Sequence, residues 1–308
     1  MRWLAIAALA LLVVGCGPNL GSLEKGEQAS VSEVSGRGAL QLDSGLRVFL
    51  AEVDLPRGDA PYAQQARQEL ESLAAHRKVQ LGYGGAHCWT PRPRRRDAET
   101  ATGTTTDAAI SAAANTATAS TATTEPDDSA DDTPGNTASA GETAIAHVFV
   151  QSEGGRWIWL QKELILRGAA FVRTRRDNHA RAAELLAAEA DARAAHRGLW
   201  AERAYAMLSP RAAADAAAAS PSSCRGNGRY AFVEGRVAHA NVGERRASLD
   251  MDGGPFSIAI FGQGFSTWDG PAFNTFEGKR VRVRGPLGMF HDAAQICIDH
   301  AQQIELVN

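Results

Sequence analysis

Residues 157–200, WIWLQKELILRGAAFVRTRRDNHARAAELLAAEADARAAHRGLW, predict two helices joined by a short strand. In the first helix Leu160 and Leu164 lie one turn apart, and Gly168 can end the helix because glycine readily takes the left-handed conformation. The next residues, AAFV at 169–172, form a short apolar run that favours an extended strand. The pattern therefore indicates a helix–strand–helix unit.

The second helix of this unit has a broad apolar stripe. Its members are Ala182, Leu185, Leu186, Ala188, Ala192 and Ala195. We expect Glu189, four residues before Arg193, on the outer side of the helix, where the two opposite charges support each other. Gly198 ends the helix, and Leu199 and Trp200 are placed to fold back on its last turn.

The order WLQ…L…G.A.V…L…E..AR…RGLW in this stretch resembles the C-terminal half of the thermonuclease, or staphylococcal nuclease-like, family. Residues 46–76, LRVFLAEVDLPRGDAPYAQQARQELESLAAH, are similar to that family's central strand, its VD.P turn and its first helix. The resemblance covers residues 31–205 with one interruption. It implies an α+β fold at residues 31–208, a five-stranded OB (oligonucleotide/oligosaccharide-binding) barrel with three helices.

The hydrophobic pattern of the same region predicts the elements that such a barrel needs. Strands are expected at 31–34, at 40–42 and 46–50 around a hairpin turn at 43–45, at 78–83 and at 146–151. Pro61 is expected in the first turn of a helix whose inner stripe is Ala63, Ala66, Leu70 and Leu73.

The resemblance also implies a catalytic set: a calcium ion held by aspartates, a glutamate that acts on the attacking water, and two arginines that neutralise the phosphate. The VDLP turn at 53–56 retains one aspartate, Asp54. Arg57 stands where the glutamate would follow the proline, and Phe49 stands at the position of the first arginine. An arginine at neutral pH cannot accept a proton.

Two further positions depart from the family pattern. Residues 35–37, Ser-Gly-Arg, lack the carboxylates of the second metal-binding turn, and Thr143 stands at the position of the second arginine. A lone Asp54 is more often a turn-forming aspartate than a metal ligand. We therefore expect a nuclease fold without nuclease activity, and we assign no catalytic residue, metal ligand or cofactor.

One alternative stays open for the catalytic set. Glu52, Asp59 or the arginines beside the interruption could take the missing roles from shifted positions. The protein would then be a calcium-dependent phosphodiesterase acting on nucleic acid.

The beginning of the chain, MRWLAIAALALLVVGCGPN, has one positive residue and an apolar run too short to span a bilayer, which is typical of a signal peptide. VVGC at 13–16 resembles a bacterial lipoprotein processing box, in which Cys16 becomes the lipidated first residue. Residues 1–16 are then the signal peptide and 17–30 a polar tether. Gly17 after the cysteine favours anchoring in the outer membrane, facing the periplasm; ordinary signal cleavage nearby is the alternative.

The interruption at residues 91–142 is rich in Thr, Ala, Ser and Asp, a composition typical of disorder. Residues 97–142 contain nine acidic residues and no Lys or Arg. Four arginines precede this tract: Arg92, Arg94, Arg95 and Arg96. We expect them to balance the acidic tract, with phosphate binding as the alternative.

An Ala/Ser/Pro-rich linker is expected at 209–223, followed at 224–308 by five candidate strands separated by Gly, Asn and Asp turns. This pattern predicts an all-β domain, and EGRV…FEGKRVRVRGPL resembles small OB domains. Gly235 and Gly285 lie where curved barrel strands often need a bulge or kink. An exported protein favours oxidised thiols, and Cys224 with Cys297 is the preferred disulfide because both flank this domain, leaving Cys88 over.

Arg280, Arg282 and Arg284 share one face of a strand in this domain. We favour a solvated face over a phosphate site, because acidic and basic residues balance from 224 to 308. Six aromatic residues could stack bases or sugars, although most are expected in the barrel core and a covering loop. They are Phe256, Phe261, Phe265, Trp268, Phe273 and Phe276.

These observations favour a lipid-anchored periplasmic binding or scaffolding protein with no chemistry of its own. The net charge of −3 gives no overall attraction to nucleic acid or to an anionic membrane. Besides the phosphodiesterase, a nucleic-acid or glycan binder acting through the C-terminal barrel remains an alternative, and the partner in the periplasm is not identified.

Overall fold

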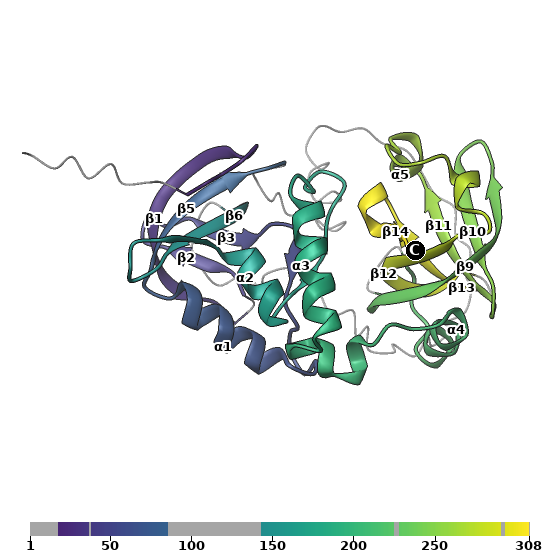
Figure 1. Cartoon of the computed structure of the whole chain (residues 1–308), viewed down its shortest axis with the longest axis horizontal. Helices are drawn as coiled ribbons and strands as arrows, with labels where there is room; N and C mark the ends of the chain where they lie inside the picture. The colour runs from purple at the N-terminus through teal and green to yellow at the C-terminus, as the bar shows by residue number, and fades with distance from the viewer. Residues whose placement is uncertain (1–17, 37, 86–142, 225–227, 291–292, 308) are drawn as a thin grey trace, which may run out of the picture. The chain divides into compact units, whose positions relative to one another are not determined.

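The computed structural model, drawn in Figure 1, describes residues 18–36, 38–85, 143–224, 228–290 and 293–307. The predicted signal peptide at 1–16 with Cys16, the insert at 91–142 with the four arginines before its acidic tract, Arg37 and Cys88 lie outside the described residues. None of the helices among the described residues is long and apolar enough to cross a membrane.

The first half of the described chain forms a closed five-stranded barrel. Its strands are β1 (Glu24–Val34), β2 (Leu40–Leu42), β3 (Arg47–Leu50), β5 (Lys78–Tyr83) and β6 (Thr143–Gln151). They pair in the order β3-β2-β1-β5-β6, and a parallel β3–β6 pairing closes the ring. The short β7 (Trp157–Trp159) extends the sheet beyond β6. The predicted OB barrel is confirmed, because an OB fold is a five-stranded Greek-key barrel.

Three helices follow or connect these strands, as predicted: α1 (Ala63–Ala74), α2 (Leu160–Arg167) and α3 (Ala182–Ala194). The short β8 (Phe171–Val172) lies between α2 and α3 and pairs with β4 (Val53–Asp54). Gly168 ends α2 at φ 69°, in the left-handed region. A 3₁₀ turn, η1 (Gly198–Ala201), follows α3 and buries Leu199 and Trp200. A second, η2 (Arg203–Tyr205), comes next.

Two boundaries in this half differ from the sequence prediction. β1 begins at Glu24, so residues 24–30 of the expected tether are part of the barrel and pair with β5. The sequence pattern did not predict a strand at 24–30 because most of these side chains are polar. A strand forms through backbone hydrogen bonds and does not need apolar side chains on its exposed face. Pro61 precedes the N-cap residue Tyr62 and therefore lies before the first turn of α1.

The second half forms another closed five-stranded barrel (Figure 1). Its strands are β9 (Tyr230–Val242), β10 (Arg246–Met251), β11 (Phe256–Phe261), β12 (Arg280–Phe290) and β13 (Ala293–Ile298). They pair in the order β13-β11-β10-β9-β12, with an additional β12–β13 pairing and a parallel β11–β13 pairing. The third and fifth strands are thus parallel in both barrels, and the OB-like prediction for this half is confirmed.

Short elements complete the second barrel. They are α5 (Gln263–Ser266), η3 (Phe273–Phe276), η4 (Ala301–Gln303) and β14 (Ile304–Leu306), which pairs with β12. Its core is apolar and includes Val233, Leu249, Ile258 and Ile296, all fully buried.

The predicted linker contains a helix, α4 (Pro210–Ala219). Ser209 caps it by accepting a hydrogen bond from the Ala212 backbone N–H, and Pro210 occupies the first turn, where its missing N–H costs nothing. Ala213, Ala214 and Ala217 are buried in the core of the second barrel. A side chain at Gly235 would lie 2.7 Å from Pro210 and 2.9 Å from Met251, so this glycine permits close packing of α4.

Candidate functional site

The VDLP turn lies where β4 meets the loop before α1, and two arginines bind the carboxylate of its aspartate. Asp54 Oδ1 accepts hydrogen bonds from the Leu55 backbone N–H at 3.0 Å and from Arg57 Nη2 at 2.7 Å. Its Oδ2 accepts one from Arg173 Nη1 at 2.6 Å. Asp54 is 8 % exposed, which makes these charge-assisted bonds less screened than surface ones. A calcium ion at this carboxylate would have to displace two guanidinium groups.

The residues that stand at the family's catalytic positions come from different elements: the loop after β4, strand β3 and strand β6. Arg57, at the position where the family's glutamate would activate a water, instead forms an ion pair with Asp54. Phe49 lies in β3 opposite Ile145, and Thr143 begins β6 opposite Arg47. Arg173, which follows β8, was not anticipated from the sequence. Only the β4–β8 pairing brings it to Asp54, since 119 residues separate the two.

The two acidic residues considered as substitutes do not join Asp54 in a carboxylate cluster. Glu52 has a fully buried side chain and sits at φ 63°, in the left-handed region. Its carboxylate contacts His147 Nε2 at 3.1 Å and accepts from the Arg181 backbone N–H at 3.0 Å. Asp59 is exposed. In the part of the chain that the structure describes, no three His, Cys, Asp or Glu side chains are arranged to hold a metal ion.

A hollow of about 380 Å³ opens beside the turn, and we call it the arginine groove. It is lined by Gly36, Gly38, Leu55, Pro56, Arg57, Gly58, Ala63, Gln64 and Arg67. Two of these residues are arginines and none is acidic. Arg67 forms an exposed pair with Glu71 one turn along α1, at 3.0 Å. Such an exposed pair contributes little, so Arg67 is available to an anion that enters the groove. Arg57 stays bound to Asp54, but that single negative charge is shared with Arg173, so one positive charge remains unbalanced beside the groove.

The prediction that Arg280, Arg282 and Arg284 form a solvated face is wrong for two of the three side chains. Arg280 is exposed, but Arg282 is 19 % exposed and Arg284 only 1 %. Arg280 and Arg282 both bind Glu234 on β9, at 2.9 and 2.7 Å. Arg284 binds Glu189 of α3 at 2.7 Å and also Glu305 of β14. These contacts neutralise the strand, which argues against phosphate binding there.

The prediction that Glu189 lies on the outer side of α3 is wrong. Its side chain is fully buried and accepts hydrogen bonds from Arg284, from Arg193 and from the Val172 backbone N–H. Leu185, Glu189 and Ala192 follow the spacing of one helical face, so the sequence did carry a signal for burial. It was overlooked because glutamate is rarely buried without a partner, and the partner comes from β12, 95 residues away.

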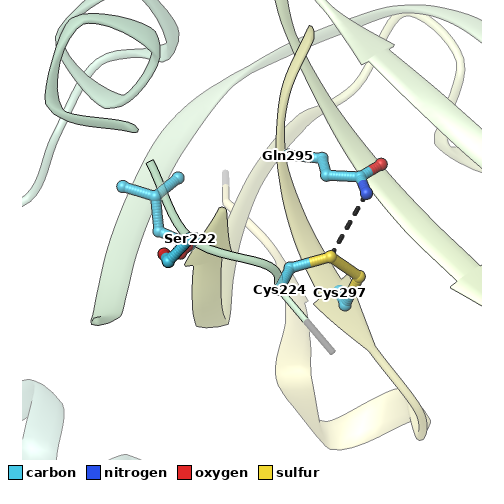
Figure 2. The surroundings of a disulfide bond; sticks show 5 residues. Ser222, Cys224, Gln295 and Cys297 are labelled. Atoms are coloured by element: carbon cyan, nitrogen blue, oxygen red, sulfur yellow. Dashed lines mark hydrogen bonds between the residues drawn. A yellow bond between two sulfur atoms is a disulfide. The ribbon is translucent and has the colours of Figure 1, made fainter. Parts of the chain in front are cut away.

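The disulfide prediction can be compared directly with the structure. Cys224 and Cys297 are bonded, with their Cα atoms 5.4 Å apart, and Gln295 donates to Cys224 Sγ at 3.2 Å (Figure 2). Met289 donates its backbone N–H to the Ser222 carbonyl at 2.7 Å. The disulfide therefore ties the segment before the second barrel to β13, and the hydrogen bond ties the same segment to β12.

The aromatic residues of the second barrel mostly serve its core. Phe256, Phe273 and Phe276 are buried. Phe265 and Trp268 are half-buried and pack on Phe273, at ring-centroid distances of 5.8 and 4.7 Å. Two aromatics of β9 have another role. Tyr230 and Phe232 pack against Phe171 of β8, at 5.2 and 5.8 Å.

Comparison with protein families agrees with this geometry. The model described as staphylococcal nuclease homologue matches residues 98–202, a range that includes β6, β7, α2, β8 and α3. Comparison with curated proteins returns no match. The matched range supplies the last barrel strand and two of the three helices, and residues 24–83 supply the rest of the barrel and α1. The chain therefore carries a staphylococcal nuclease-like domain, followed by a second, OB-like barrel.

Proposed function

We propose that this protein is an exported, lipid-anchored binding protein that uses a nuclease fold without hydrolysing phosphodiesters. The observation that carries the proposal is the state of Asp54, whose two carboxylate oxygens are bound by Arg57 and Arg173. A nuclease of this family needs that carboxylate free for its metal and a glutamate where Arg57 stands. The sequence of residues 1–16 supports export and lipidation at Cys16, with the protein held at the outer membrane and facing the periplasm.

The arginine groove supports an anionic ligand. Arg57 and Arg67 supply the positive charge, and three of the lining residues are glycines, which leave the backbone open to a bound group. Guanidinium groups bind phosphate and carboxylate oxygens in a bidentate geometry that needs no metal. The ligand class we propose is therefore a phosphate- or carboxylate-bearing group on a larger periplasmic partner, bound without calcium.

Cleavage of single-stranded DNA tests the absence of hydrolysis. The full-length chain in detergent would be incubated with calcium, beside a calcium-free control and an Asp54→Ala variant. Cleavage no faster than the control supports the proposal. Calcium-dependent cleavage that disappears in Asp54→Ala would overturn it and establish the calcium-dependent phosphodiesterase in its place.

Binding of a short fluorescein-labelled oligothymidylate, followed by anisotropy in EDTA, tests the groove. The double variant Arg57→Gln/Arg67→Gln should bind about tenfold more weakly, and its slope of log affinity against log salt should fall by about 1.4, because each phosphate contact contributes about 0.7. Arg211→Gln is the matched control, since Arg211 also forms an exposed ion pair one turn along a helix, with Asp215. Equal weakening in both variants would show general charge attraction and contradict the proposal.

A further inference from the structure

Glu189 joins three separate parts of the fold through one buried carboxylate. Its Oε2 accepts from the Val172 backbone N–H of β8 at 2.7 Å. Its Oε1 accepts from Arg193 on the same helix at 3.1 Å and from Arg284 of β12 at 2.7 Å. Both oxygens are used, which a fully buried carboxylate requires because it has lost its water.

Arg284 is the matching group on the second barrel. Its side chain is 1 % exposed and lies between Glu189 and Glu305, a carboxylate from each half of the chain. Burial disfavours its charge, but the two carboxylates outweigh this and raise the pKa of Arg284 above its ordinary value. The guanidinium also lies over the Phe232 ring, 5.7 Å from its centroid. Arg284 thus stays charged and has few alternative positions.

The same contacts lead directly to the arginine groove. Val172 pairs with Val53 of β4, and Phe171 pairs with Asp54. Arg173, the residue after Val172, binds Asp54 Oδ2, and Asp54 Oδ1 holds Arg57 at the groove. The path from Arg284 to Arg57 therefore runs through Glu189, the β8 backbone and Asp54, and each step is a hydrogen bond or a strand pairing.

Apolar packing alone would not define this arrangement. Phe171, Trp200 and Phe232 form a small buried cluster at the same place, with Tyr205 and Tyr230 packed around it. Apolar contacts are non-directional and tolerate sliding, whereas a buried carboxylate with three donors has one satisfactory geometry. The ionic contacts are therefore what sets the position of β8 relative to β12.

We propose that Glu189 is a positioning residue through which the second barrel sets the geometry of the arginine groove. The second barrel then regulates ligand affinity without touching the ligand. The functional readout of this inference rests on the function proposed above, but the mechanical coupling does not.

Hydrogen–deuterium exchange of the full-length chain tests the coupling. In Arg284→Met, peptides that contain Val172 and Leu55 should exchange more than tenfold faster than in the unmodified protein. Glu189→Gln should do the same, and the double variant should add little, because both changes break one connection. Arg280→Met is the matched control: Arg280 lies on the same strand, but its guanidinium binds Glu234 instead of Glu189, and the variant should leave both peptides unchanged.

Faster exchange confined to β12 and β14 in Arg284→Met would overturn the inference. If that variant exchanges throughout because it does not fold, Arg284→Lys decides the question. It keeps the charge but loses the forked geometry, and unchanged exchange at Val172 and Leu55 in a folded Lys variant would also contradict the inference. In the oligothymidylate assay, Arg284→Met should weaken binding about threefold to tenfold. If the unmodified protein does not bind the probe, the proposed function fails, while the exchange result still decides the coupling.

Discussion

Loss of the Cys224–Cys297 disulfide should lower the unfolding free energy of the second barrel, and the length of the loop between the two cysteines predicts by how much. The bond closes a loop with a sequence separation of 73 residues, for which the chain-entropy model gives about 4 kcal/mol. Cys224 is buried, and the neighbouring segment adds to β12 through the Met289–Ser222 hydrogen bond, so native contacts keep the two cysteines close. The perturbation is Cys224→Ala/Cys297→Ala, which removes the bond without leaving reactive thiols.

Urea denaturation followed by tryptophan fluorescence measures this effect. With a slope of about 2–3 kcal/mol per molar urea, the midpoint should fall by about 1.3–2 M. Cys88→Ala would be present in both the variant and its reference, so that thiol exchange cannot contribute. Reduction of the reference protein should reproduce the shift. A midpoint that moves by less than about 0.3 M would refute the reasoning, because the loop would then impose no measurable constraint on the unfolded chain.

Three further predictions concern other parts of the molecule. Gly168→Ala should lower the unfolding free energy by about 3 kcal/mol, because the residue is held at φ 69° and a Cβ would lie 2.1 Å from the Arg197 carbonyl. Gly154 has open space around it, so Gly154→Ala should leave the unfolding free energy nearly unchanged in the same urea assay. Stability should fall as the pH drops below about 4.5. Burial raises the pKa of Glu234, but hydrogen bonds from Arg282 and Arg280 outweigh it, and the hydrogen bond from Arg181 lowers the pKa of Glu184. A carboxyl group whose pKa is lower in the folded state stabilises the fold above its unfolded pKa, and this contribution disappears as the pH falls through the folded pKa. Glu234→Gln should therefore make the unfolding free energy depend less on pH between pH 6 and 3. An unchanged plot of unfolding free energy against pH would contradict this. Calcium titration by calorimetry should give no heat of binding for the unmodified chain, whereas a measurable heat that is absent in Asp54→Ala would show that calcium displaces the two arginines.

Local patterns in the sequence determined most of the fold. The strand at 78–83 has the predicted bounds, and the helix that ends at Gly168 does so in the left-handed conformation. Leu199 and Trp200 are buried after α3 as expected. These features depend on neighbours within one or two turns, and their residue types carry the physical cause directly.

The prediction that groups of the nuclease site are missing also comes from the sequence, since Arg57 and Phe49 stand at two of the positions that the family resemblance assigns to them. Only the tertiary structure decided which charged residues contact one another. Arg173 reaches Asp54 through the β4–β8 pairing, and Arg284 reaches Glu189 across 95 residues. A single charged residue looks the same in sequence whether water or a distant opposite charge surrounds it, because the energy of a buried charge depends on partners that only the folded chain assembles.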